Sequence, residues 1–118
     1  MAQIYHIAAA ADWAQAREAG EYRLSTRGLS LAEVGFIHAS AAHQVAPVAN
    51  ALYGDATGLV VLVIDAGRVG APIRYERVPG SADPFPHIYG PLNADAVVQV
   101  LPFGPEASGR FSFPPPES

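Results

Sequence analysis

The sequence predicts an α+β fold, in which a small, bent and mostly antiparallel sheet packs with two or three helices. Short apolar segments rich in β-branched residues recur along the chain, and Ala-rich segments at helical spacing lie between some of them. Their order is mixed rather than strictly alternating, which is typical of α+β proteins. The chain has 118 residues, of which 50% are hydrophobic, so it can bury one core.

The N-terminal part predicts a strand followed by a helix. Residues 3–8 alternate polar and apolar side chains, which indicates a strand that carries His6 on one face. An Ala-rich helix is expected over residues 10–19, because Gly20 stands where helices commonly end. Residues 21–34 predict a loop that contains a single helical turn near its end.

A second strand and a proline-containing helix come next. Residues 35–39 indicate a short strand that ends at Ser40, a good N-cap for the Ala-rich segment that follows. Pro47 interrupts this segment, because an interior proline loses a hydrogen bond and clashes with the preceding turn, at a cost of about 3 kcal/mol. We therefore expect the main helix to begin near Pro47, after a separate turn at 41–45, and to end at Gly54.

The second half of the chain predicts mainly strands. Residues 59–64 form a continuous β-branched run, so we expect the central strand here, buried on both faces. Residues 73–78 alternate and predict a half-exposed strand. Residues 85–92 must be extended around Pro86, since residues before proline avoid the helical region. After a turn, residues 97–101 predict the last strand.

The final residues, 104–118, predict a tail. They are rich in Gly, Pro, Ser and Glu and lack periodic apolar positions, so we expect them to contribute nothing to the core. The predicted organisation is a single α+β domain over residues 1–103, followed by this tail.

Composition excludes several kinds of function. The chain has no cysteine, which excludes disulfides, thiolate metal sites and cysteine nucleophiles, and it has no lysine for a Schiff base. The net charge is −4 and the seven arginines are scattered, which argues against a nucleic-acid partner. No apolar run approaches the roughly 20 residues of a membrane span, and no basic signal-peptide start is present. A cytoplasmic protein without a membrane partner is expected.

Three histidines are the main functional signal. His6, His38 and His87 each lie within an apolar β segment, and in a small domain such side chains tend to share one polar interior. Burial and mutual repulsion would keep them neutral, so that they can act as bases, donate to hydroxyls or bind a metal. We expect them to line one cleft, with His43 outside it on the surface. A three-histidine zinc site is geometrically possible, but no acid lies near these histidines in the sequence to orient such ligands, so no metal ligands are assigned unless folding brings an acid there.

Neighbouring polar residues complete the candidate site. Ser40 and Tyr89 follow His38 and His87 at the spacing of two that places them on the same strand face, so they are candidate ligand contacts. Glu76 is the one carboxylate that we can place near the sheet, as a candidate base. The competing interpretations are a helix cap for Ser40, core packing for Tyr89, a solvated face for Glu76 and a structural core position for each histidine.

Four motifs closely resemble the uncharacterised family DUF952. They are Ile4-Tyr-His-Ile, Gly35-Phe-Ile-His-Ala-Ser, Arg74-Tyr-Glu and Phe85-Pro-His-Ile-Tyr-Gly-Pro-Leu, and the resemblance covers about residues 3–102. The architecture of this family is similar to that of the ADP-ribosyltransferase-like superfamily. This similarity implies a split, bent sheet with a cleft for NAD or a related nucleotide, and, for an enzyme, a transferase or glycohydrolase.

The resemblance also implies roles for two residues, His6 and Ser40. At two other positions the chain departs from the superfamily. His6 is placed like a histidine that contacts the adenosine ribose, and Ser40 like a residue of the nicotinamide pocket. Ile7 stands where these transferases commonly have glycine, and His87 where they have the catalytic glutamate. The activation of an acceptor nucleophile is then unexplained by the resemblance.

Two functions follow from these patterns. In the first, the chain is an enzyme that binds a nucleotide-like small molecule through His6, Ser40 and Tyr89, with His38, His87 and Glu76 in catalysis. In the second, it is a noncatalytic domain that binds a small molecule or a protein, and its histidines are structural.

Overall fold

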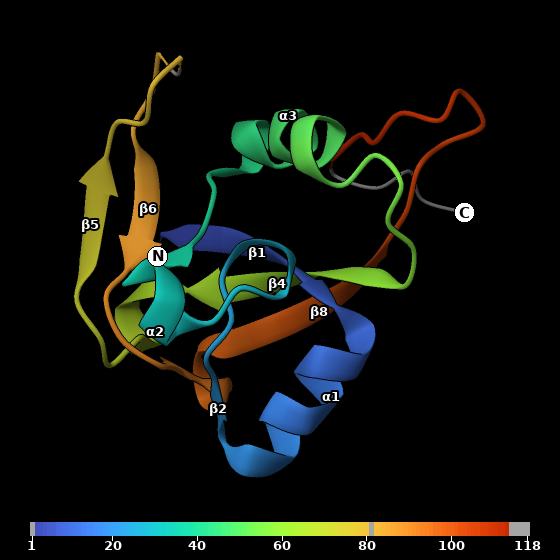
Figure 1. Cartoon of the computed structure of the whole chain (residues 1–118). Coiled ribbons are helices and arrows are strands. Elements are labelled where there is room, and N and C mark those ends of the chain that lie inside the picture. The colour runs from blue at the N-terminus through green and yellow to red at the C-terminus, as the bar shows by residue number, and fades with distance from the viewer. Residues whose placement is uncertain (1, 81, 114–118) are drawn as a thin grey trace.

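The computed structural model describes residues 2–80 and 82–113. Its longest strands form one sheet, in the order β1-β4-β8 (Figure 1). β1 spans Gln3–Ala9, β4 spans Leu59–Asp65 and β8 spans Val97–Phe103. β4 lies in the middle, and all of its residues but one are buried. The prediction of a buried central strand over residues 59–64 is therefore confirmed.

Two smaller sheets lie beside the first. One has the order β3-β6-β5, with β3 at Ile37–His38, β5 at Ile73–Glu76 and β6 at Phe85–Ile88. The other pairs β2, Glu21–Tyr22, with β7, Leu92–Asn93. Every strand pair in the described part of the chain is antiparallel. The prediction of a small, mostly antiparallel α+β fold is confirmed, although its strands are divided among three sheets.

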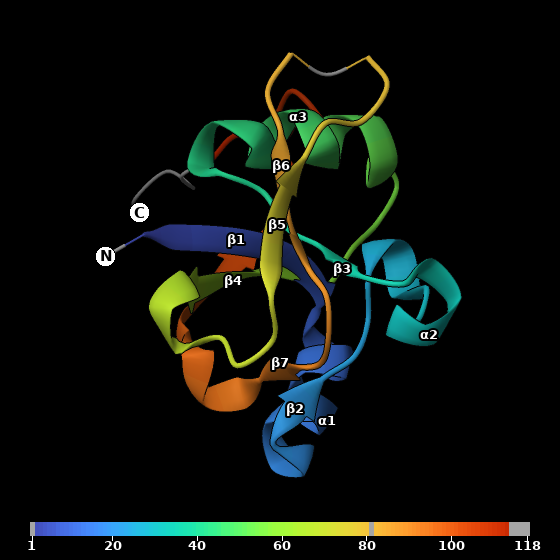
Figure 2. The same ribbon diagram turned by 90° about the vertical axis from the view of Figure 1, so that its left-hand side faces the viewer.

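A backbone bridge joins the two three-stranded sheets. The N–H of Tyr5 in β1 donates to the carbonyl of Ser40, at 2.8 Å, and the N–H of Ser40 donates to the carbonyl of Tyr5, at 2.7 Å. Figure 2 shows the resulting arrangement, in which the β5–β6 hairpin stands across the strands of the first sheet. Ser40 is thus fixed between β3 and the helix that follows.

The described residues form three α-helices, and local sequence accounts for the ends of two of them. α1 spans Ala10–Ala19, α2 spans Leu31–Val34 and α3 spans Ala42–Leu52. Gly20 ends α1 with a φ of 90°, a left-handed conformation that glycine adopts without strain. Ser30 begins α2 with a capping box, because its hydroxyl accepts from the Glu33 N–H while the Glu33 carboxylate accepts from the Ser30 N–H. Short 3₁₀ turns at Thr26–Gly28, Ala66–Arg68 and Ala94–Ala96 complete the elements.

α1 and α3 pack on opposite sides of the long sheet (Figure 1). Trp13 of α1 belongs to a core cluster with Ile4 and Leu62, which also contains Ile88 of the second sheet. Val45 of α3 belongs to a separate cluster on the other face, with side chains such as Ile7 and Val61. The alternation of β1 between these clusters places His6, two residues after Ile4, on the side of α1 and the second sheet.

α3 differs from the prediction in two ways. It runs without interruption from Ala42 through Pro47, so the expected separate turn at 41–45 is wrong. Pro47 has no N–H to donate to the carbonyl of His43, one turn earlier in the helix. Both residues are exposed, so water can bind this carbonyl instead. Ser40 is not the N-cap either. Ala41 precedes the helix, and its N–H donates to the side-chain oxygen of Gln44 at 2.8 Å.

The expectation that the tail adds nothing to the core is also wrong for its described part. Phe111 is only 4% exposed and packs with Phe103 of β8, with ring centroids 4.9 Å apart. Its backbone is held by Asn50 of α3, which accepts from the Phe111 N–H at 2.8 Å and donates to the Phe111 carbonyl at 3.1 Å. Sequence patterns did not predict this contact, because a single aromatic side chain creates no periodic pattern. Residues 114–118 lie outside the described residues.

Within the described residues, no helix has both the length and the apolar character that crossing a membrane requires.

The docked tail gives a stability prediction. Phe111→Ala removes a buried aromatic ring, so the free energy of unfolding should fall by about 3 kcal/mol, as for other large-to-small core substitutions. Urea denaturation of the full chain measures this. Val98→Ala is the control, because Val98 is 45% exposed and its truncation should change stability little. Equal stability of Phe111→Ala and the unsubstituted chain would contradict the docking of this segment.

Candidate functional site

The second sheet places two histidines directly opposite each other. His38 of β3 and His87 of β6 are register partners in the antiparallel pair. Their imidazoles are in hydrogen-bond contact, with 3.2 Å between Nδ1 of His38 and Nε2 of His87. Arg74 of β5 is the register partner of His87 on its other side. The sheet thus brings together residues that are 49 positions apart in the chain.

A carboxylate completes this contact on the far side of His87. Nδ1 of His87 lies 2.7 Å from Oε1 of Glu76, and the Tyr89 hydroxyl donates to the same oxygen. Hydrogen bonds from Tyr89 and then from His87 lower the pKa of Glu76, so it is an anion at neutral pH. The Arg74 guanidinium lies 5.2 Å from the centre of the Tyr89 ring, where cation–π attraction holds both side chains.

The carboxylate determines which nitrogens carry protons along the chain of contacts. An ionised carboxylate only accepts hydrogen bonds, so Nδ1 of His87 carries the proton that Glu76 accepts. When His87 carries only this one proton, its Nε2 is an acceptor and Nδ1 of His38 donates to it. The remaining nitrogen of His38, Nε2, therefore carries a lone pair. It has no hydrogen-bond partner among residues 2–80 and 82–113.

Burial keeps His38 neutral. The pKa of His38 is lowered to about 4, mainly by burial and further by the proximity of His87 and His6. Aromatic rings enclose the two imidazoles: Phe36 stacks on His87 with centroids 4.0 Å apart, and Phe85 lies 4.8 Å from His38. His38 is consequently neutral across the neutral pH range, with one proton on Nδ1, and can accept a second proton at Nε2.

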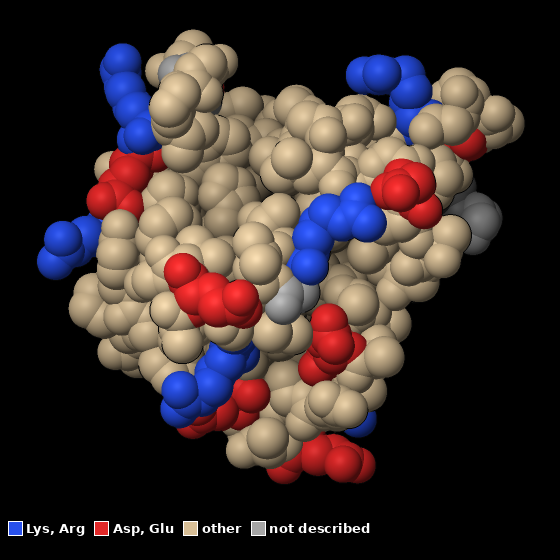
Figure 3. All heavy atoms as spheres, viewed as in Figure 1, with Lys and Arg blue, Asp and Glu red and all other residues tan. Residues whose placement is uncertain are grey.

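His38 lines a groove between α3 and the β5–β6 hairpin. Its volume is about 530 Å³, which falls within the range of small-molecule sites. The lining is mostly apolar and comes from both elements: Pro47, Val48 and Leu52 on α3, and Val78, Pro79 and Phe85 on the hairpin. Figure 3 shows this side of the molecule, where charged side chains are scattered and the surface is hollowed between the hairpin and α3.

His43 lies at the rim of the same groove. Its side chain is exposed, as predicted, but it lines the groove together with His38, so the expectation that it lies outside the site is wrong. Nε2 of His43 lies 3.0 Å from a carboxylate oxygen of Asp83 in the hairpin loop. This contact connects the first turn of α3 to the hairpin across the groove.

His6 is enclosed by protein on all sides. Its Nδ1 lies 2.6 Å from the His38 carbonyl, so Nδ1 carries the proton, and its Nε2 accepts from the Tyr22 hydroxyl at 3.0 Å. The side chain is 3% exposed, and burial lowers its pKa to about 4 against the smaller opposing effect of the His38 carbonyl. Both ring nitrogens of His6 are therefore occupied by protein partners.

The three histidines are connected by hydrogen bonds and do not line one open cleft as expected. His6, His38 and Ser40 border a cavity of only about 10 Å³, which has room for about one water molecule. His87 is 2% exposed beneath Phe36. Ser40 is 4% exposed, and its backbone forms the bridge between the sheets.

Two residues that sequence reasoning missed hold the backbone of His38 in place. The Ser25 hydroxyl accepts from the His38 N–H at 3.1 Å, and Tyr22 acts through His6 on the His38 carbonyl. Ser25 and Tyr22 lie in the segment that was expected to be a loop, where no periodic pattern marks them. The groove was missed as well, because its two walls are distant in sequence.

Among the described residues, no group of three or more His, Cys, Asp or Glu side chains has an arrangement that could hold a metal ion.

Comparisons with known proteins find a family and solved relatives. Residues 7–100 match the model of a family described as "Protein of unknown function (DUF952)". The crystal structure of protein CC0527 from Caulobacter crescentus is 29% identical in sequence, with a TM-score of 0.81 over 94% of each chain, and a double mutant of that protein gives the same values. The solution NMR structure of CC0527 is 31% identical, with a TM-score of 0.75 over 93% of this chain and 91% of that one. No curated protein matches the chain.

The buried histidines predict a pH-dependent stability. The pKa of His6 is lowered from 6.5 to about 4 in the folded state, so below pH 6.5 the unfolded chain binds a proton that the folded chain does not. The free energy of unfolding should therefore fall by about 1.4 kcal/mol per pH unit, or about 2 kcal/mol from pH 6.5 to 5, for this residue alone. His38 acts in the same direction.

Urea denaturation at pH 7.5 and pH 5 measures this difference. Gln99→Ala is the control, because Gln99 is exposed on β8 and carries no titratable group, so its loss should leave the pH dependence unchanged. If the chain is equally stable at both pH values, the two imidazoles are not buried in their neutral form.

Proposed function

This chain belongs to the DUF952 family, and on that premise we propose that it is an enzyme in which His38 acts as a general acid–base on a small molecule bound in the groove. One observation carries the proposal. Nε2 of His38 has a lone pair that is fixed by the chain of contacts from Glu76 through His87, and His38 lines the groove. A base oriented by a second group that is itself fixed by a carboxylate is a recurrent arrangement in catalytic sites.

Each member of the chain has a separate role in this proposal. His38 removes a proton from a water or hydroxyl of the bound substrate. Its pKa of about 4 keeps Nε2 free at neutral pH and makes the protonated ring a ready donor to a leaving group. His87 holds the His38 ring in the productive tautomer, and the Glu76 carboxylate stabilises the positive charge that develops on the two imidazoles.

We propose a nucleotide-like ligand, with NAD or a related nucleotide as the first candidate. This class follows from the resemblance to the ADP-ribosyltransferase-like superfamily, which for an enzyme implies a transferase or glycohydrolase. The groove adds one restriction. Its described lining is largely apolar, contains no arginine and includes Asp83, so an uncharged ring of the nucleotide fits beside His38 and the phosphates would have to lie outside the groove.

The direct ligand contacts of His6, Ser40 and Tyr89 stay a prediction. With both ring nitrogens of His6 engaged, we propose that His6 supports the ligand site through the His38 carbonyl. Tyr89 supports it through Glu76. The same engagement of His6 favours the second candidate function, a noncatalytic domain that binds a small molecule in the groove while its histidines stabilise the fold.

The proton positions can be tested without a ligand. At pH 7 the ring nitrogens of His38 and His87 should both show Nδ1–H tautomers in long-range proton–nitrogen NMR spectra. Glu76→Ala removes the acceptor that fixes this order, so the fixed tautomers should be lost while the fold survives. Glu18→Ala, on the exposed side of α1, should leave the spectra of both rings unchanged. An Nε2–H tautomer of His38 in the unsubstituted chain would remove the proposed base.

Ligand binding is tested by a screen of nucleosides, nucleotides and NAD. A ligand at 100 times its dissociation constant should stabilise the fold by about 2.7 kcal/mol in a thermal-shift assay. His38→Asn should weaken its binding by about 1 to 3 kcal/mol, since a ligand donor loses its partner. Gln99→Ala, on β8, should not weaken it. Conversion of the bound ligand, followed by proton NMR, separates the enzyme from the noncatalytic domain. NMR shifts confined to residues away from the groove would contradict both functions.

A further inference from the structure

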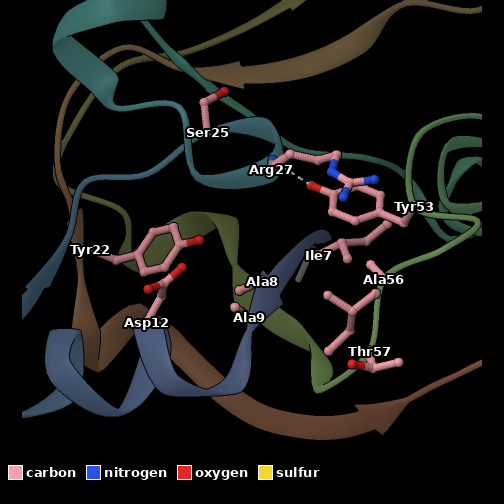
Figure 4. A pocket seen from close by; sticks show the side chains of 11 residues that line it. Ile7, Ala8, Ala9, Asp12, Tyr22, Ser25, Arg27, Tyr53, Ala56 and Thr57 are labelled. Atoms are coloured by element: carbon pink, nitrogen blue, oxygen red, sulfur yellow. Dashed lines mark hydrogen bonds between the residues drawn. The ribbon is translucent and has the colours of Figure 1, made fainter.

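A second cavity lies apart from the groove. Its volume is about 230 Å³, and it is enclosed by the start of α1, the segment around Tyr22 and the turn after α3 (Figure 4). The groove and this cavity share no lining residue. The volume is below the range of about 300–1,000 Å³ that is typical of drug-sized ligands, so the cavity fits a smaller molecule.

One end of this cavity carries two hydrogen-bond acceptors. Asp12 and Tyr22 both line it (Figure 4), and the charge of Asp12 adds to burial in raising the pKa of Tyr22. Tyr22 is 2% exposed, and because its hydroxyl donates to His6, its oxygen can only accept from a ligand. Asp12 has no hydrogen-bond or ion-pair partner among residues 2–80 and 82–113. Two acceptors, one of them charged, therefore face a ligand without a protein donor between them.

The rest of the lining combines aliphatic side chains with Arg27 and with the hydroxyls of Ser25, Tyr53 and Thr57. Ile7, Ala56 and Leu59 provide an aliphatic wall. Arg27 lines the cavity, but its guanidinium is bonded to the Asp55 carboxylate at 2.9 Å and to the Leu52 carbonyl at 2.7 Å. Its positive charge is thus balanced by protein groups outside the acceptor end.

We propose that this cavity binds a small primary alkylamine as its ammonium ion. The ammonium group has three donors and no acceptor, which matches the Asp12 carboxylate and the Tyr22 oxygen, and the alkyl chain covers Ile7 and Leu59. An anion would be repelled by Asp12. An alcohol offers a single donor for two acceptors and lacks the charge that Asp12 attracts.

The amine site is connected to the candidate catalytic histidine. The oxygen of Tyr22 that would accept from the ammonium also donates its proton to His6, and His6 donates to the His38 carbonyl. An ammonium on this oxygen makes the Tyr22 hydroxyl a stronger donor to His6. Amine binding should therefore be detected at the His6 ring as well as in the cavity.

The test is a titration of the full chain with n-butylamine and with 1-butanol at pH 7, followed by amide and histidine-ring NMR signals. Butylamine is charged at this pH, since alkylamines have pKa values near that of lysine, about 10.4. We expect saturable shifts of Asp12, Tyr22, Ile7 and the His6 ring with the amine, and at least about tenfold weaker binding of the alcohol.

Three variants decide whether these residues are responsible. Asp12→Asn should weaken butylamine binding about tenfold, and Tyr22→Phe should weaken it without loss of the ring, which keeps the test valid if Asp12→Asn unfolds. Glu18→Gln removes an equal charge from the exposed part of the same helix and should leave binding unchanged. The proposal is overturned if butylamine gives no saturable shifts, if 1-butanol binds as tightly, or if Asp12→Asn binds like the unsubstituted chain.

Discussion

The buried hydrogen-bond chain that ends at Glu76 is the constraint on which the rest of the site depends. Burying an imidazole costs free energy unless its nitrogens find hydrogen-bond partners. Here a half-exposed carboxylate supplies the one fixed acceptor, and the order of protons through His87 to His38 follows from it. The lone pair on Nε2 of His38 is therefore a consequence of the negative charge on Glu76, which acts through His87.

The backbone arrangement that makes this chain possible is specified by few contacts. β3 consists of two residues, yet it is held by β6 on one side and by the bridge between Tyr5 and Ser40 that follows it. Ser25 and His6 bind the N–H and the carbonyl of His38, respectively. Both backbone groups of His38 are thus fixed by side chains, which positions its ring more firmly than so short a strand could.

Sequence patterns predicted the parts of this molecule that depend on periodicity. The central strand, the first helix and the burial of His6 and His87 follow from local alternation and apolar neighbours, and local reasoning found them. The bonds among the histidines depend on register between β3 and β6, and the groove depends on the approach of the hairpin to α3. Neither is encoded by neighbouring residues. Phe111 and Tyr22 show the same limit, because a single side chain that docks at long range leaves no pattern.

The groove and the smaller cavity are separate and offer different chemical groups to a ligand. The groove has a candidate base, His38, and an apolar wall. The smaller cavity has two hydrogen-bond acceptors, Asp12 and the Tyr22 oxygen, at the same end. A nucleotide-like substrate and a small amine would therefore bind independently in space. The Tyr22 hydroxyl and His6 are nevertheless shared, since they join the wall of the smaller cavity to the backbone of His38. Coupling between the sites has two routes to the backbone of His38. One passes through the His6 imidazole and requires that His6 stay neutral while the domain is folded. The other passes through the Ser25 hydroxyl, which lines the smaller cavity and accepts from the His38 N–H.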